Sequence, residues 1–240
     1  MSGALDRFID HYYRRRPVNA TLTGIHAYDE KLPDWSPAGL QTLDDEMQSL
    51  HAELLAAHPK PESPLAYRDD PDLLDAELAR GFLEIQRAEN ASAHGVRGNP
   101  SLWSGEAVFS VIALMIRNFA PVSDRIGAAT ARLDAIPDFL SQAYDTLGDR
   151  PIPSSWTTRA LRECEGASIL LDRGISAWLE ATPSVAARVP RLRAAAERAS
   201  FAFAKFADWL SERPLAPHPL MACGNTLYDL LLARGHQSTR

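Results

Sequence analysis

The sequence has few of the residues and patterns that mark several protein classes. Its 240 residues include two cysteines, Cys164 and Cys223, too few for a disulfide scaffold or a four-cysteine zinc site. The longest nearly uninterrupted apolar run, residues 107–116, is half of the about 20 residues that a membrane helix needs. The first ten residues, MSGALDRFID, contain acidic residues and no apolar core, unlike an export signal. We therefore expect a cytoplasmic protein without a membrane span.

Basic residues are also fewer than acidic residues. The formal net charge is −6, so a basic surface for nucleic acid is not expected. With 45% hydrophobic and 23% charged residues, the composition is ordinary for a folded globular chain. Residues 58–69, HPKPESPLAYRD, resemble a linker most, but the segment is short and lies between amphipathic patterns. We therefore predict a single α-helical region over residues 1–240.

Strand signals are missing as well, since no Asn-Gly or Asp-Gly hairpin turn occurs. Apolar residues instead recur every three or four positions, which is typical of amphipathic helices. Capping side chains precede prolines at Ser36-Pro37, Asp70-Pro71 and Thr182-Pro183, as at helix starts. The sequence predicts an all-α fold. We expect helices over residues 2–15, 17–23, 37–57, 71–92, 104–118, 121–134, 137–147, 157–180, 183–188, 190–210 and 225–234.

The motifs of the common hydrolytic centres are absent. There is no His-Glu-x-x-His zinc motif, and the nearest approach, His51-Ala52-Glu53, lacks the second histidine. Neither a Gly-x-Ser-x-Gly nucleophile turn nor a glycine-rich phosphate loop is present. Cys164 lies between two glutamates, which should keep its thiol protonated, whereas Cys223 near a helix start is a weak candidate for a reactive thiol. We therefore predict no catalytic residues and no metal ligands in this chain.

One loop is chemically dense. His26, Tyr28 and Asp29 follow Gly24, which fits the end of a helix. They bring an imidazole, a phenol and a carboxylate close together in sequence. The loop has two interpretations: a hydrogen-bonded turn that fixes the first helices to the body, or one wall of a substrate cleft.

Two apolar segments also allow alternatives. Residues 201–210, FAFAKFADWL, predict a central core helix, with a hydrophobic ligand groove as the alternative. The last predicted helix carries more apolar surface than a terminal helix usually exposes, at Leu227, Tyr228, Leu230, Leu231 and Leu232. We expect a further part of the protein, or a partner chain, to dock near Leu227, Leu230 and Leu231.

Several motifs together resemble a known bacterial family. Residues 17–29, PVNATLTGIHAYD, and residues 32–37, LPDWSP, are similar to the N-terminal signature of the family named domain of unknown function 885. Further similar segments follow in order along the chain: Asn99-Pro100, residues 132–140, 153–157, 207–210 and 224–231.

This resemblance implies an elongated, all-helical clamp similar to that of helical zinc peptidases. Typical members are more than twice as long, and their His-Glu-x-x-x-Gly-His zinc motif follows the segment that resembles residues 224–231. This chain lacks the motif, so no zinc ligand carries over and zinc is expected only in full-length relatives. A substrate-side wall remains, with His26, Tyr28 and Asp29 as its candidates.

Three hypotheses about function follow from the resemblance and the missing motif. The chain is the N-terminal half of a zinc-dependent peptidase or other hydrolase, inactive alone, with a peptide as substrate. Alternatively, it is a stand-alone helical module that binds a peptide or a protein without turnover. In the third hypothesis, a second polypeptide supplies the zinc motif.

Overall fold

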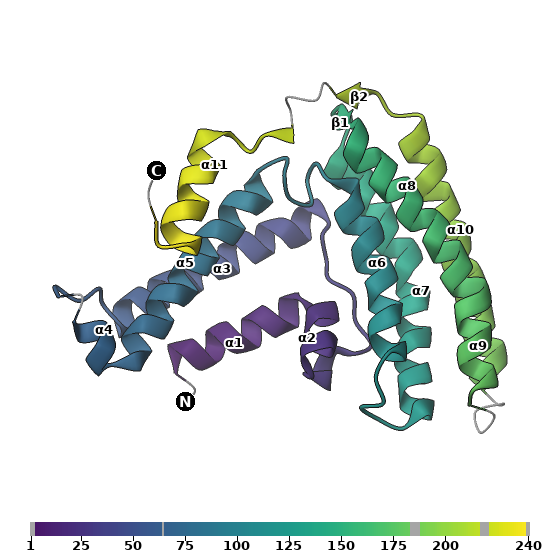
Figure 1. Ribbon diagram of the computed structural model, residues 1–240, viewed down its shortest axis with the longest axis horizontal. Helices are drawn as coiled ribbons and strands as arrows, with labels where there is room; N and C mark the ends of the chain where they lie inside the picture. Colours follow the sequence, from purple (N-terminus) through teal and green to yellow (C-terminus); the bar gives the residue numbers. More distant parts are fainter. Residues whose placement is uncertain (1–2, 64, 183–187, 217–220, 239–240) are drawn as a thin grey trace.

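The computed structural model describes residues 3–63, 65–182, 188–216 and 221–238, and these residues are almost entirely helical (Figure 1). The all-α prediction is confirmed. Two parallel two-residue strands pair with each other, Ile152 with Leu215 and Pro153 with Ala216. None of the helices in the described ranges combines the length and apolar character needed to cross a membrane.

The helices of the first part are α1 (Ala4–Arg15), α2 (Pro17–Thr23), the 3-10 turn η1 (His26–Tyr28), α3 (Pro37–Ala57), α4 (Ala66–Asp69) and α5 (Pro71–Ala91). Those of the second part are α6 (Pro100–Met115), α7 (Val122–Leu147), α8 (Ser154–Ile169), η2 (Leu170–Gly174), α9 (Ile175–Glu180), α10 (Val189–Ser211), α11 (Gly224–Leu230) and η5 (Leu231–Gly235), with strands β1 (Ile152–Pro153) and β2 (Leu215–Ala216).

Side-chain caps begin the helices as the sequence predicts. Ser36 Oγ accepts a hydrogen bond from the backbone of Gly39 at 3.0 Å, and Asp70 Oδ1 accepts one from Asp72 at 3.0 Å. Each cap satisfies an amide that has no partner within its helix. Pro183, the first position of the predicted Thr182-Pro183 start, and most of the helix predicted at 183–188 lie outside the described residues.

Several of the predicted helices differ from those in the structure. The helices expected at 121–134 and 137–147 are one helix, α7, which continues through Pro137. A proline removes one helical hydrogen bond, but burial of Leu133, Ile136 and Leu140 on either side of it offsets this loss. The helix expected at 104–118 begins earlier, because Asn99 caps α6. The helix expected at 157–180 contains a widened π turn, η2.

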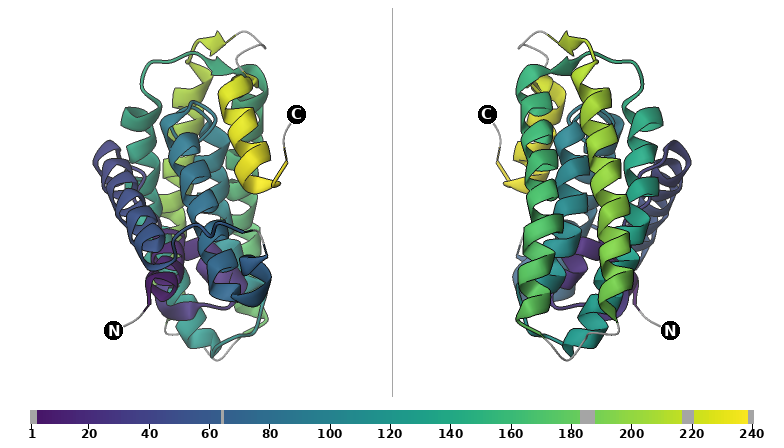
Figure 2. Two further views of the ribbon diagram at one scale, coloured as in Figure 1. Left: turned by 90° about the vertical axis from the view of Figure 1, so that its left-hand side faces the viewer. Right: turned by 90° about the vertical axis from the view of Figure 1, so that its right-hand side faces the viewer.

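The helices form two groups that meet at the centre of the molecule. In the main bundle, α7 packs against α6 and α10, and α8 packs against the same two helices. In the side group, α3 packs against α1 and α5. The two views of Figure 2 show the side group on one flank and α8, α9 and α10 on the other. Short α2 joins the groups because it follows α1 and packs on α6.

The core lies mainly in the main bundle. Trp103 is fully buried and packs against Phe139 and Trp35, with ring centroids 5.1 and 5.2 Å away. In α10, Phe203 and Phe206 are buried, which confirms residues 201–210 as part of a core helix. Phe201 is 63% exposed instead and lines an open cavity of about 320 Å³ between α7 and α10.

Candidate functional site

The loop after α2 is held by its own side chains. Gly24 ends α2 with a φ of 94°, a left-handed conformation that glycine adopts without strain. His26 stacks on Phe119 with 3.9 Å between ring centroids and 5° between the planes. Its Nδ1 lies 3.0 Å from Asp29 Oδ2. The other carboxylate oxygen of Asp29 accepts a hydrogen bond from Thr21 Oγ1 at 2.6 Å.

Tyr28 lies apart from the other two candidates. Its hydroxyl donates a hydrogen bond to Asp10 Oδ1 of α1 at 3.1 Å. Burial, together with this bond, raises the pKa of the Tyr28 phenol above its usual value. The structure therefore brings His26 and Asp29 together and directs the Tyr28 hydroxyl towards α1.

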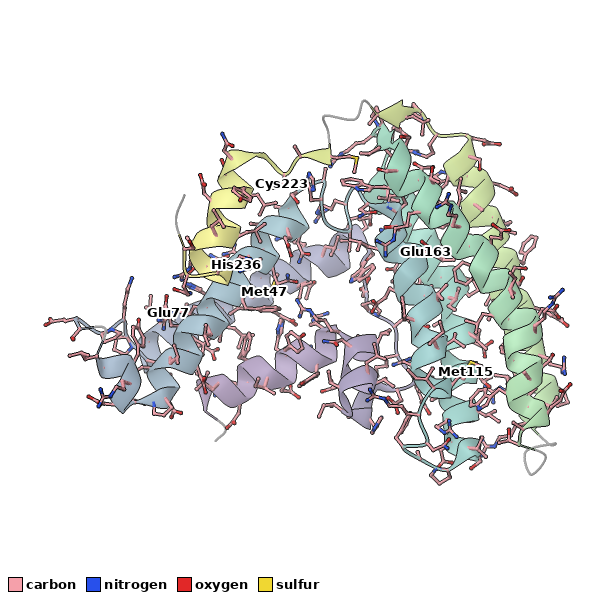
Figure 3. All side chains as sticks on the ribbon, viewed as in Figure 1. Met47, Glu77, Met115, Glu163, Cys223 and His236 are labelled. Carbon is pink, nitrogen blue, oxygen red and sulfur yellow. The ribbon has the colours of Figure 1, made fainter. Side chains whose placement is uncertain are left out.

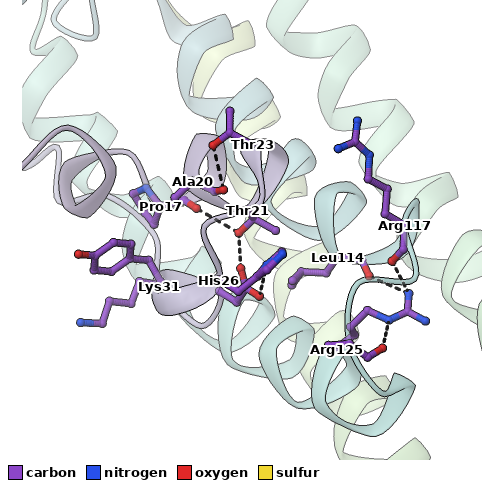
Figure 4. A network of polar contacts seen from close by, with 12 residues as sticks. Pro17, Ala20, Thr21, Thr23, His26, Lys31, Leu114, Arg117 and Arg125 are labelled. Atoms are coloured by element: carbon purple, nitrogen blue, oxygen red, sulfur yellow. Dashed lines mark hydrogen bonds and ion pairs between the residues drawn. The ribbon is translucent and has the colours of Figure 1, made fainter. Parts of the chain in front are cut away.

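A cavity of about 460 Å³ opens beside this loop. His26, Asp29, Lys31, Phe119 and Arg125 are among its lining residues. Arg125 donates to the carbonyls of Leu114, Arg117 and Ala120, which ties the end of α6 to the start of α7 (Figure 4). The contacts of Asp29 with Thr21 and His26, and the stacking of His26 on Phe119, support the interpretation of the loop as a structural turn. Substrate binding by His26 and Asp29 stays a prediction.

A buried arginine that the sequence does not single out as a site residue anchors the same loop. Arg132 of α7 is fully buried, and its guanidinium donates to several oxygens without an ion-pair contact to a carboxylate among the described residues. The acceptors are the backbone oxygens of Pro17, Tyr28, Lys31 and Ser110, and Thr21 Oγ1. Arg132 therefore joins α2, the η1 loop, α6 and α7.

A second unexpected group is the carboxyl of Glu106 on α6. Burial raises its pKa to about 7, and the nearby positive charges of Arg132 and Arg16 only partly oppose this shift. Arg16 lies in the turn between α1 and α2. Because the Glu106 carboxyl interacts with Arg16 as well as with Arg132, it lies near the junction of the two helix groups. Sequence reasoning missed Glu106 because a lone glutamate in an apolar helix carries no motif.

An open groove lies between α1 and α5, and we call it the α1–α5 groove. Its volume is about 630 Å³. Aromatic and aliphatic side chains of both helices line it, including Phe8, Ile9, Tyr12, Tyr13, Leu78 and Phe82. Asp75 is the charged residue among those that line the groove.

The described residues contain no group of three or more histidine, cysteine, aspartate or glutamate side chains that could hold a metal ion. They therefore do not fit the zinc site that the resemblance implies for full-length relatives, and we derive no reaction step through zinc. His51 instead lies 3.0 Å from Glu84, between α3 and α5. Cys164 is buried, and burial, followed by the charge of Glu163, raises the pKa of its thiol to about 12.

The last described helix is held mainly by charge. None of the residues of α11 or η5 is fully buried, and Tyr228 is 48% exposed. Arg234 donates to Glu84 from Nε and Nη2 and to Glu77 from Nη1, each at 2.6 Å. Figure 3 shows Glu77 on α5 close to the end of this segment, where His236 is labelled. Leu227, Leu230 and Leu231 remain partly exposed beside this contact.

Comparison with known proteins identifies the family. Residues 17–240 match the family described as bacterial protein of unknown function, DUF885. The chain belongs to this family, which confirms the resemblance of its motifs. No curated protein matches the chain.

The fold also matches a solved structure from Shewanella oneidensis, described as a putative lipoprotein of unknown function. The two chains are 19% identical, and the TM-score is 0.77. The match covers 96% of this chain and 41% of the other. This chain thus spans less than half the length of that relative, and at this identity the likeness concerns the fold alone.

Proposed function

We propose that this chain is the N-terminal, substrate-side part of a zinc-dependent hydrolase and has no hydrolytic activity alone. The motifs that resemble the family suggest a peptide as the substrate and a zinc centre formed by other residues. In this role the chain contributes helical walls and orientation. We also propose that the protein is cytoplasmic.

The observation that carries this proposal is the partial match to the larger helical protein, with 96% of this chain aligned to 41% of its length. The partly exposed leucines of α11 and η5 also support it. Apolar surface at Leu227, Leu230 and Leu231 is suited to packing against further helices. Arg234 holds this segment on α5 and thereby orients the surface.

The experiment is to isolate the native protein from its source cells with antibodies raised against the 240-residue chain. We expect a polypeptide more than twice as long as this chain, with bound zinc and zinc-dependent peptidase activity. The 240-residue chain, purified in the presence of zinc, should retain no stoichiometric metal and cleave no peptide. Stoichiometric zinc with turnover in that chain would contradict the proposal.

The second candidate function is a stand-alone module that binds a peptide or a protein without turnover. The α1–α5 groove favours it, because an open apolar cavity can bind a partner without any catalytic centre. A native polypeptide of 240 residues with no associated chain would support this alternative. A separate polypeptide that co-purifies and carries the zinc would instead support completion of the site by a partner.

A further inference from the structure

We infer that the α1–α5 groove binds a peptide segment that carries large apolar side chains next to a lysine or arginine. The identification of this segment as substrate rests on the proposed function, whereas the binding itself does not. The groove lies away from the His26–Asp29 loop and uses other side chains.

The wall of the groove is a connected set of rings. Phe82 of α5 lies 5.9 Å from Phe8 and 5.3 Å from Tyr12, measured between ring centroids. Ile9 is 51% exposed and Leu78 is 48% exposed. This surface is open to solvent in the described chain, and an apolar peptide side chain placed on it would remove area from water on both partners.

The groove carries acidic charge at both edges. Asp75 lines it from α5 and is exposed. On α1, the exposed Asp6 lies three positions before Ile9. Residues three apart are neighbours on a helix surface, so this carboxylate borders the apolar wall. The acidic rim attracts a basic peptide and disfavours an acidic one.

The arginines of α1 do not neutralise this rim, because they pair on the side of α1 that faces α3. Arg7 Nε lies 2.8 Å from Glu53 Oε2, and Arg15 Nη2 lies 2.5 Å from Glu46 Oε1. Both glutamates belong to α3. The charges of these two arginines are therefore directed away from the groove, whereas Arg16, which follows α1, lies over two of its rings.

The rings of the groove already accept a cation from the chain itself. The guanidinium carbon of Arg16 lies 4.7 Å from the centroid of Tyr12 and 5.0 Å from that of Phe82. Such contacts are attractive because the face of an aromatic ring is electronegative. A peptide lysine or arginine can stack in the same way on Phe8 or Tyr13, which are partly exposed and line the groove, with Asp75 as its carboxylate partner.

The test measures binding of fluorescein-labelled peptides to the 240-residue chain by fluorescence anisotropy. The probe has two leucines, one phenylalanine and two lysines between terminal glycines. One matched peptide replaces the lysines with glutamate, and another replaces the apolar residues with serine. We expect saturable binding of the probe, binding of the glutamate peptide weakened by about tenfold or more, and no saturable binding of the serine peptide. Binding should also weaken as salt is added.

Two variants locate the binding site. Asp75→Asn should weaken probe binding about threefold, as expected for an exposed ion pair, and Leu78→Ser should weaken it about tenfold. Glu165→Gln and Ile169→Ser on α8 are matched controls, since Glu165 is exposed and Ile169 is 56% exposed. Circular dichroism and cooperative unfolding establish that each variant is folded.

Three results would overturn the inference: equal affinity for the lysine and glutamate peptides, Asp75→Asn and Leu78→Ser behaving like the controls, or a dimer that Leu78→Ser dissociates. The last result would mean that a second copy covers the groove. The outcome is separable from that of the proposed function. If the probe binds and the native polypeptide has 240 residues, the inference about the groove holds and the hydrolase proposal fails. If the probe does not bind and the native polypeptide is longer and holds zinc, the hydrolase proposal holds and the inference about the groove fails.

Discussion

The guanidinium of Arg132 donates from Nη2 to the hydroxyl of Thr21, 2.7 Å away and 111 positions earlier in the chain. Thr21 Oγ1 in turn donates to Asp29 Oδ1, and Asp29 lies against His26. The candidate loop is therefore connected to the centre of α7 through one continuous series of polar contacts. Any role of this loop depends on that anchor.

Replacing Arg132 tests the anchor directly. Arg132→Lys keeps the charge but cannot reproduce the planar donors that contact oxygens of α2, the η1 loop and α6. We expect the free energy of unfolding to fall by about 3 kcal/mol, because buried oxygens lose their partners. Urea unfolding at neutral pH measures it. Arg162→Lys, at an exposed position of α8, is the control, and a loss equally small in both variants would show that the anchor contributes little.

The carboxyl of Glu106 should make stability depend on pH. Its pKa is raised to about 7 in the fold, first by burial, so the unfolded state ionises at lower pH than the folded state. The destabilisation therefore develops as pH rises from about 4.5 to about 7, and it disappears below this range. Relative to wild type, Glu106→Gln should gain up to about 3 kcal/mol between pH 4.5 and pH 8.

Denaturant unfolding of both proteins across this range measures the difference. Glu165→Gln, on an exposed face of α8, controls for removal of a carboxylate. A difference between Glu106→Gln and wild type that stays constant with pH would contradict the assignment.

His11 should have the opposite pH dependence. It is 4% exposed, and burial is the largest cause that lowers its pKa to about 4, with Glu46 opposing and the arginines of α1 adding to the effect. The unfolded state thus binds more protons between about pH 4 and 6.5, and stability falls as pH falls through this window. Nuclear magnetic resonance of the ring carbons should show a neutral imidazole at pH 5.5. Titration near pH 6.5 in the folded protein would refute this expectation.

Arg234 should control the attachment of the last helix. Burial would raise the pKa of Glu77, but hydrogen bonds from Arg80 and Arg234 lower it below the usual value. In Arg234→Gln the charge-assisted bonds from Arg234 to Glu77 and Glu84 are lost, while Arg80 still contacts Glu77. We expect amide hydrogen exchange over residues 224–235 to accelerate at least tenfold, with a change in global stability below about 1 kcal/mol. Arg162→Gln should leave exchange in this segment unchanged.

The sequence predicts local features of the fold more reliably than its long-range contacts. Ser36 and Asp70 cap their helices as expected, because capping depends on residues a few positions apart. The sequence predicts a break before Pro137, where a second helix begins, yet packing of its neighbours maintains α7 as one helix. Tertiary burial outweighs local propensity at such a position.

The same limit applies to the candidate site. His26 and Asp29 lie together because they are three positions apart, and Tyr28 separates from them because its hydroxyl meets Asp10 on α1. The burial of Arg132 could not be predicted, since nothing local distinguishes it from the exposed arginines. The α1–α5 groove likewise forms between two helices that are far apart in the sequence, and the pattern of neither helix predicts that they pack together. Phe8 and Tyr12 alone predict only an apolar face.

The π turn η2 limits how the length of the chain can vary here. Ala167, Leu171, Ile175 and Leu179 are all buried, and each follows the previous one by four positions. In a regular α-helix such a row turns around the helix axis by about 40° at every step. The π turn η2 has more residues per turn, so these four side chains stay on the same face of the helix. A relative with one residue fewer between 170 and 174 would rotate Ile175 and Leu179 by about 100°. A relative with such a deletion can keep this packing only if apolar residues occupy other positions in the helix that follows.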